Sequence, residues 1–205
     1  MLKLFFLKRL LPIVSNNFEK QIALNFRKPQ RSLHSEKIFS FIKNSGITYK
    51  KKRMFKESEQ LLSSLGFKII SKDFTRPWGG FLVIDETQAQ EFSNHFFKGL
   101  NIDTLKIGGK LSPKVLIVKP KARLSWQYHN RRAEVWQIFK GSAGIVRSDS
   151  DAENVMGIYK DGDQIVLKQG ERHRLIGLDE PCVAAEIWQH TDKNCPSDED
   201  DIIRV

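Results

Sequence analysis

The pattern of hydrophobic and polar positions changes along this chain near Gly108. Before that point, apolar residues recur at the spacing of a helix. Residues 57–65 predict a first helix, and Gly66 is a plausible stop after it. A short strand is expected at residues 68–70. The apolar residues that we expect on one face of the first helix are Leu61, Leu62 and Leu65.

A second helix is predicted over residues 87–98. Thr87 is placed to cap its start, with Gln90 three residues later as the reciprocal partner, and Gly99 ends it. The residues expected on its buried face are Phe92, His95 and Phe96. In that position His95 is interpreted as a packed core residue rather than a ligand.

After Gly109, short apolar and β-branched runs alternate with turn residues at spacings near ten. No helical pattern separates them, which favours an antiparallel sandwich or barrel. The segments predicted as strands are Val115–Val118, Glu134–Phe139, Gly144–Arg147, Met156–Tyr159, Gln164–Leu167, Arg172–Ile176 and Val183–Trp188.

The net charge of +10 belongs to the N-terminal part of the chain. Residues 1–53 hold 13 of the 34 Lys and Arg but two of the 24 acids, so the remaining residues carry 21 basic and 22 acidic side chains. The rest of the chain therefore has no basic excess with which to bind nucleic acid. We expect a basic, weakly structured extension over 1–53 and a domain over 54–205, with Met54 as a candidate natural start.

The first fifteen residues are apolar and basic, and Lys8 and Arg9 interrupt the apolar run. That pattern leaves a membrane-surface helix or an organelle presequence open beside the leader interpretation. No run of 18 apolar residues exists, so no transmembrane segment is expected. Cys182 and Cys195 lack CxxC spacing and are interpreted as inert thiols, which fits a reducing, cytoplasmic location.

Two later segments hold residues that suit a metal site. Gln127 and His129 are two apart, so on a strand both point to the same side, and Glu134 follows after a short turn. His173 comes three residues after a glycine in the second segment. Imidazole, carboxylate and amide groups from these four residues suit Zn²⁺, Mn²⁺, Co²⁺, Fe²⁺ or Ni²⁺ and leave positions open for substrate.

The same two segments resemble the paired motifs of the cupin superfamily, G-x5-H-x-H-x(3,4)-E-x6-G and G-x5-P-x-G-x2-H. Every spacing fits from Gln127 to Gly141 and from Gly162 to His173. Two identities differ: Gln127 stands for the first histidine, and Lys168 stands for the proline. The resemblance implies an all-β jelly-roll barrel (a double-stranded β-helix), here preceded by short N-terminal helices.

The pattern Q-x-H-x4-E-x-W is more specific and resembles the cupin domain of type II phosphomannose isomerases. The resemblance covers about residues 75–204. Further matching segments are Arg76–Gly79, Leu124-Ser125, Arg132–Glu134, Ala185–Ile187 and Glu199–Arg204. It implies a metal-dependent aldose–ketose isomerase acting on mannose 6-phosphate or a heptose phosphate, with zinc as the first choice of metal.

Glu186 is the candidate base for moving the proton, because its neighbours match this family; a partner that orients His173 is the alternative role. Arg204, also family-matched, is the first candidate for contacting the substrate phosphate and belongs to the predicted catalytic set. The other residues predicted to bind substrate are Arg76, Trp78, Lys119, Arg123 and Arg132.

Two other classes of function remain open on the sequence. The family that this sequence resembles usually continues past the position of Val205 with a short acidic, Arg-containing tail. Its absence here keeps open, as the alternative to an isomerase, a non-catalytic cupin that binds a sugar or a nucleotide sugar. A non-haem iron oxygenase is the less favoured alternative. Pairing of two barrels in a homodimer is compatible with each of these functions.

Overall fold

The computed structural model describes residues 52–106 and 109–205. The extension predicted over 1–53, with its leader, presequence and surface-helix alternatives, lies almost entirely outside the described residues. Within them, no helix has the length and apolar character needed to cross a bilayer.

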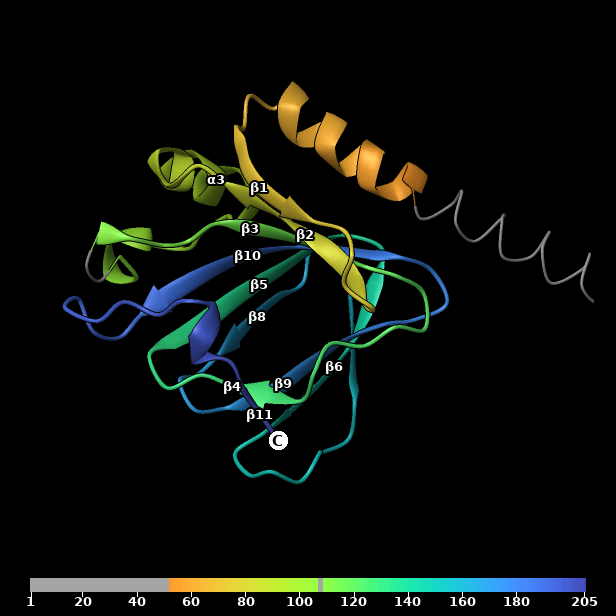
Figure 1. The fold of residues 1–205 in the computed structure, drawn as a ribbon, viewed down its shortest axis with the longest axis vertical. Helices are drawn as coiled ribbons and strands as arrows, with labels where there is room; N and C mark the ends of the chain where they lie inside the picture. The colour runs from red at the N-terminus through yellow and green to blue at the C-terminus, as the bar shows by residue number, and fades with distance from the viewer. Residues whose placement is uncertain (1–51, 107–108) are drawn as a thin grey trace, which may run out of the picture. The chain divides into compact units, whose positions relative to one another are not determined.

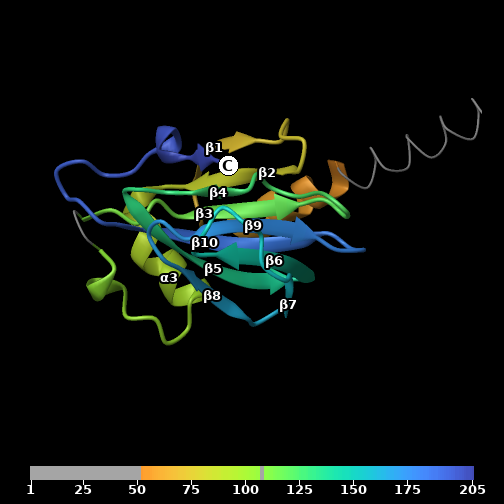
Figure 2. The ribbon, with the colours of Figure 1, turned by 90° about the horizontal axis from the view of Figure 1, so that it is seen from below.

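Two antiparallel sheets form the body of the structure (Figures 1 and 2). The six-stranded sheet has the order β1-β2-β3-β10-β5-β8, and the five-stranded sheet has the order β11-β4-β9-β6-β7. The strands are β1 (Ile69–Asp73), β2 (Gly79–Ile84), β3 (Lys114–Val118), β4 (Gln127–Tyr128), β5 (Arg132–Lys140), β6 (Ser142–Ser148), β7 (Gly157–Lys160), β8 (Gln164–Leu167), β9 (Arg172–Gly177), β10 (Cys182–His190) and β11 (Ile203–Arg204).

All seven strands predicted after Gly109 are present, within one or two residues at most ends. The strand β2 was not predicted, because its two leading glycines are typical of a turn. Gly79 in fact lies against β3, where a Cβ atom would come 1.9 Å from the carbonyl oxygen of Ile117. Its φ of +152° is also rare for other residues. Gly79 therefore lets the two strands approach closely.

The side chains of the barrel form two separate cores. Between the sheets, alternate residues of the strands pack around Trp136, Ile138 and Leu175. On the outer side of the six-stranded sheet, Leu62 and Phe92 pack on residues of β5 and β10. Figure 1 shows the helix over residues 52–64 and α3 (Ala89–Phe96) together on that side.

The first helix ends as predicted, because Gly66 adopts a φ of +84° and the amide of Phe67 donates to the carbonyl of Leu62. The predicted apolar face is only partly correct. Leu62 is fully buried, whereas Leu61 is 41% exposed. Since the helix packs on a sheet along a narrow stripe, one turn of it contributes a single fully buried leucine.

The predicted start of the second helix is wrong. The capping residue is Asp85 rather than Thr87, because the Asp85 side chain accepts a hydrogen bond from the amide of Thr87. It caps a 3-10 turn (Glu86–Gln88) that precedes α3. Gln90 does not cap that turn but donates to Asn94 one turn later. The prediction that His95 is buried is also wrong: its side chain is exposed, with its ring edge against Phe96.

Candidate metal centre and substrate cavity

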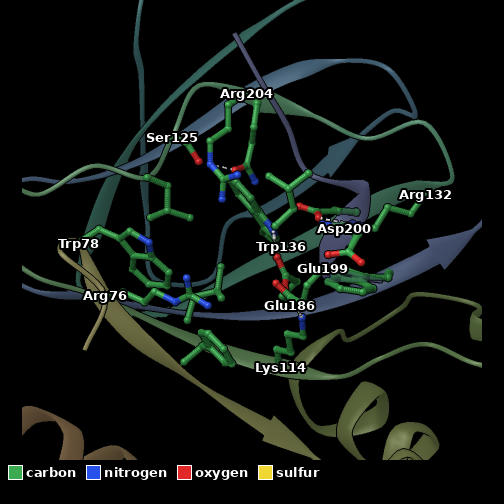
Figure 3. Close-up of a pocket in the computed structure, with 17 residues that line it drawn as sticks. Arg76, Trp78, Lys114, Ser125, Arg132, Trp136, Glu186, Glu199, Asp200 and Arg204 are labelled. Atoms are coloured by element: carbon green, nitrogen blue, oxygen red, sulfur yellow. Dashed lines mark hydrogen bonds and ion pairs between the residues drawn. The ribbon is translucent and has the colours of Figure 1, made fainter. Parts of the chain in front are cut away.

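A cavity of about 330 Å³ opens between the two sheets (Figure 3). Its wall includes apolar residues of the six-stranded sheet and an even mixture of cations and carboxylates. Seven residues named from the sequence line it: Arg76, Trp78, Gln127, Arg132, Glu134, Glu186 and Arg204. Lys119 and Arg123 lie outside the described lining of the cavity, so the geometry does not support their predicted role in binding substrate.

Three of the four predicted metal-binding residues form a buried cluster, and one of them, Glu134, lines the cavity, whereas His129 and His173 lie outside its described lining. His129 follows β4, Glu134 lies on β5 and His173 lies on β9. All three are buried, and one nitrogen or oxygen atom of each lies within 4.8 Å of the others. The Nε2 atom of His129 is 3.1 Å from one Glu134 oxygen, and the Nε2 atom of His173 is 3.4 Å from the other.

The Nδ1 hydrogen bonds of the two histidines leave the lone pair of the other ring nitrogen, Nε2, directed toward the cluster. The Nδ1 atom of His129 lies 2.8 Å from the carbonyl oxygen of Asp201, and the Nδ1 atom of His173 lies 2.9 Å from that of Glu171. A carbonyl oxygen only accepts, so Nδ1 carries the proton and Nε2 presents its lone pair. This is the tautomer in which imidazole binds a metal.

The polar atoms of the cluster are also incompletely bonded. Within the described residues, Glu134 Oε2 and His173 Nε2 are buried and have no hydrogen-bond partner. Buried polar atoms are rarely left in that state. Burial acts to raise the pKa of Glu134, but its interactions with His129 and with the guanidinium of Arg132 outweigh burial and hold that pKa well below its usual value. An ionised carboxylate with two imidazole lone pairs fits a divalent cation.

Gln127 is placed next to this cluster by the sheet register. It is the cross-strand partner of His173 on β9 and of Arg204 on β11, and it lines the cavity. Its Oε1 atom accepts a hydrogen bond of 2.5 Å from the hydroxyl of Ser125. The amide oxygen retains a second lone pair, so Gln127 remains available as a fourth ligand.

Arg132 is fully buried and joins the cluster to the C-terminal segment. Its Nε atom donates to Glu134 at 2.8 Å, and its Nη1 atom donates to the hydroxyl of Ser197 at 2.8 Å. Its Nη2 atom lies 3.2 Å from His129 Nε2, and its guanidinium stacks 3.7 Å from the ring centre of Trp188. A metal at His129 would displace the Nη2 contact while the other contacts of Arg132 remain available.

Glu186 faces the cavity from β10. Its carboxylate accepts a 2.9 Å hydrogen bond from the indole nitrogen of Trp136, whose ring meets His173 edge-on. Burial, helped by the charge of Glu134, raises the pKa of Glu186 to about 7, although Lys114 acts in the opposite direction. His173 is oriented by a backbone carbonyl, which argues against the alternative role of Glu186 as its orienting partner.

Three charged residues of the cavity wall were missed by the sequence analysis: Lys114, Glu199 and Asp200. Lys114, at the start of β3, and Glu199, in the 3-10 turn η4 (Glu199–Asp201), form an ion pair there. Lys114 precedes an apolar run, and a charged residue at the end of a buried strand was the available signal. Of the cysteines, Cys182 is buried, which raises its pKa to about 12 and fits an inert thiol, and Cys195 is exposed.

His190 fastens the C-terminal segment to the barrel. Its fully buried ring accepts a hydrogen bond from the amide of Ser197 at 3.0 Å and lies 3.3 Å from the hydroxyl of Ser112. Burial, with smaller effects of the charges on Lys110 and Arg132, lowers the pKa of His190 from 6.5 to about 4. The folded protein thus keeps this ring neutral where the unfolded chain would protonate it.

We expect His190 to make stability sensitive to acid. Between about pH 6.5 and 4 the unfolded state binds the extra proton, so the free energy of unfolding falls as the pH falls. Urea denaturation measures the difference in free energy of unfolding between the wild type and His190→Gln. This difference should become about 2 kcal/mol less favourable to the wild type from pH 7 to pH 4.5. A difference between wild type and His190→Gln that stays constant with pH would contradict the assignment.

Comparison with known proteins places this geometry in a family. The family model described as "Mannose-6-phosphate isomerase C-terminal" matches residues 99–205. A 47-residue segment is 43% identical to the alginate biosynthesis protein AlgA of Pseudomonas aeruginosa, a match covering 23% of this chain and 10% of AlgA. The chain therefore matches a small part of that relative.

Solved structures with similar folds share little sequence with this chain. An oxalate oxidase matches with a TM-score of 0.39, 16% identity and 46% of each chain covered. A Cupin 2 conserved barrel domain protein from Salinispora arenicola matches with a TM-score of 0.33 and 21% identity, over 40% of this chain and 64% of that one. The double-sheet antiparallel barrel with its short leading helices is a cupin fold, and the chain belongs to the mannose-6-phosphate isomerase C-terminal family.

Proposed function

We propose that this protein is a metal-dependent isomerase that interconverts an aldose phosphate and a ketose phosphate, of the mannose 6-phosphate or heptose phosphate type. One observation carries the proposal. Glu134, which forms a buried cluster with His129 and His173, lines the same cavity as Glu186, a carboxyl group whose pKa of about 7 suits proton transfer. Membership of the family supports the same reaction.

The proposed metal ligands are His129, Glu134, His173 and Gln127. A divalent cation bound there would supply Lewis acidity, polarising the sugar carbonyl or hydroxyl oxygen. We favour Zn²⁺, with Mn²⁺, Co²⁺, Fe²⁺ and Ni²⁺ as alternatives, because two imidazoles and a carboxylate suit each of these ions. The Nδ1 hydrogen bonds of the two histidines hold their rings in the orientation that this role requires.

Glu186 is the proposed base. Isomerisation moves a proton between two adjacent carbons, so the same group must take the proton from one carbon and return it to the other. A pKa near 7 makes both directions accessible at neutral pH. The indole N–H of Trp136 holds one carboxylate oxygen, which leaves the second oxygen for the substrate.

The cations of the cavity wall are proposed to bind the anionic substrate. Arg76 lies in the connection between β1 and β2, and Arg204 is exposed at the end of β11 beside Gln127. Trp78 offers an apolar surface for the sugar carbons. The cavity volume of about 330 Å³ is that of a site for one small molecule.

The test is an assay of the full chain with mannose 6-phosphate and, separately, with a heptose phosphate. We expect the ketose phosphate to form with a divalent metal present, and we expect chelation to abolish turnover. Turnover that survives exhaustive chelation would contradict the metal mechanism. Thermal stabilisation by the sugar phosphate without turnover would identify a non-catalytic binding protein, and oxygen uptake with Fe²⁺ would identify an oxygenase; either result would overturn the proposal.

A further inference from the structure

Lys114 is a buried cation in the cavity wall. Its side chain is 9% exposed, and its Nζ atom lies 3.7 Å from the ring centre of Trp188 and 5.7 Å from that of Phe81. On the neighbouring strand its cross-strand partner is Glu186. A buried ammonium is costly unless a negative charge compensates it. Lys114 therefore needs an anionic partner whether or not substrate is bound.

In the free protein that partner is Glu199, and the two side chains of the ion pair differ in how far they are exposed and able to move. Lys114 is enclosed by aromatic rings, whereas the side chain of Glu199 is 54% exposed. The segment that carries Glu199 is fastened through other residues: Ser197 binds Arg132, and Asp201 accepts hydrogen bonds from the backbone of residues 130 and 131. Glu199 can turn into solvent without releasing this segment, and Lys114 cannot follow.

We propose that Lys114 binds the phosphate group of the substrate, and that the Glu199 carboxylate occupies the phosphate position beside Lys114 when substrate is absent. The inference rests on the proposed function, which supplies a phosphate monoester as the anion. A phosphate dianion carries more charge and more acceptor oxygens than a carboxylate, so it competes well for the same ammonium. Glu199 is then an internal competitor of the substrate.

The arrangement of cations favours Lys114 over Arg204 for this role. The guanidinium of Arg76 lies 5.6 Å from the ring centre of Phe81, which also neighbours Lys114, so one aromatic ring has two cations close to it. Arg204 extends from the opposite sheet, beside Ser125 in Figure 3. Phosphate at Lys114 and Arg76 leaves Arg204 for the sugar oxygens next to Gln127.

Calorimetric titration of the full chain with inorganic phosphate tests the inference without any turnover. Lys114→Met should weaken phosphate binding by about 10- to 100-fold, the usual effect of losing a hydrogen bond to a charged group. Glu199→Gln should strengthen binding by about 2- to 5-fold, because the competing charge is gone. Asp200→Asn is the matched control: it removes the same charge from the adjacent cavity residue, and affinity should stay within about 2-fold.

The double variant separates competition from a general change of charge. If Glu199 acts through Lys114, Glu199→Gln should add nothing in the Lys114→Met background. Equal strengthening in both backgrounds, equal strengthening by Asp200→Asn, or loss of phosphate binding in Arg204→Gln but not in Lys114→Met would overturn the inference. If thermal melting shows that Lys114→Met is unfolded, the phosphate affinities of Glu199→Gln and Asp200→Asn test the inference instead.

The proposed isomerase activity can fail separately. Absence of turnover in the wild type, with the expected phosphate affinities, would leave Lys114 as the anion site of a binding protein. Normal turnover, with phosphate affinity unchanged in Lys114→Met, would overturn the assignment of Lys114 and leave the isomerase proposal in place.

Discussion

His173→Ala should abolish both metal binding and isomerase turnover. The Nε2 atom of His173 is buried, has no hydrogen-bond partner among the described residues and lies 3.4 Å from Glu134. Loss of one of the two imidazole ligands leaves one histidine, one carboxylate and the weakly binding amide of Gln127, which together hold a divalent metal weakly. We expect a fall in turnover of at least about 10³-fold, since both the Lewis acid and its charge are lost.

Two measurements distinguish this effect from unfolding. Metal content after dialysis should fall to background in His173→Ala, while circular dichroism should show an intact barrel. His95→Ala is the matched control, because it removes the same side chain from an exposed position outside the barrel cavity. A folded His173→Ala protein that retains bound metal and turnover would reject the cluster as the metal centre.

The sequence predicted the barrel well because its strands follow a local rule. Short apolar and β-branched runs between turn residues mark β5, β6, β8, β9 and β10. The register of one strand on the next follows from burial of the same face. Strands of two residues, such as β4 and β11, have no period to detect. They form because the register with β9 and with each other places them there.

The metal cluster was predictable for a similar reason. The spacing of the two motifs along the chain named His129, Glu134 and His173 as ligands, and the structure brings one ligand atom of each within 4.8 Å of the others. The pairing of Lys114 with Glu199 was not predictable in this way, because 85 residues separate the two. Side-chain contacts of that kind depend on how the C-terminal segment crosses the cavity, which no local pattern encodes.

The misplaced helix cap shows the limit of motif reading. Thr87 and Gln90 have the spacing of a capping box, yet Asp85 two residues earlier caps the turn and also pairs with Lys68. The competition between two adequate caps is decided by tertiary contacts. The prediction that His95 is buried failed for the same reason. The helix α3 covers the sheet with Phe92 and Phe96 and leaves His95 exposed to solvent.

Glu186→Gln should lower kcat by about 10²- to 10⁴-fold with little change in KM, because the amide keeps the shape of the carboxylate but cannot accept a proton. The wild-type kcat/KM should rise with pH through about pH 7, as the carboxyl group loses its proton and becomes a base. That rise should disappear in Glu186→Gln and persist, at a lower rate, in Glu186→Asp. Glu180→Gln, an exposed glutamate outside the cavity, is the control.

The same substitution should stabilise the protein at alkaline pH, which makes the loss of activity hard to attribute to unfolding. The pKa of Glu186 is about 7 when folded and near 4.5 when unfolded, so the folded state binds the extra proton between these values. Stability due to Glu186 is therefore full below about pH 4.5 and is lost as the pH rises through 7. Since glutamine carries no charge at any pH, Glu186→Gln should melt at a higher temperature than the wild type at pH 8, and this advantage should shrink toward pH 5. If Glu186→Gln is inactive and also less stable than the wild type at pH 8, Glu186 has a structural role. Another group would then have to transfer the proton.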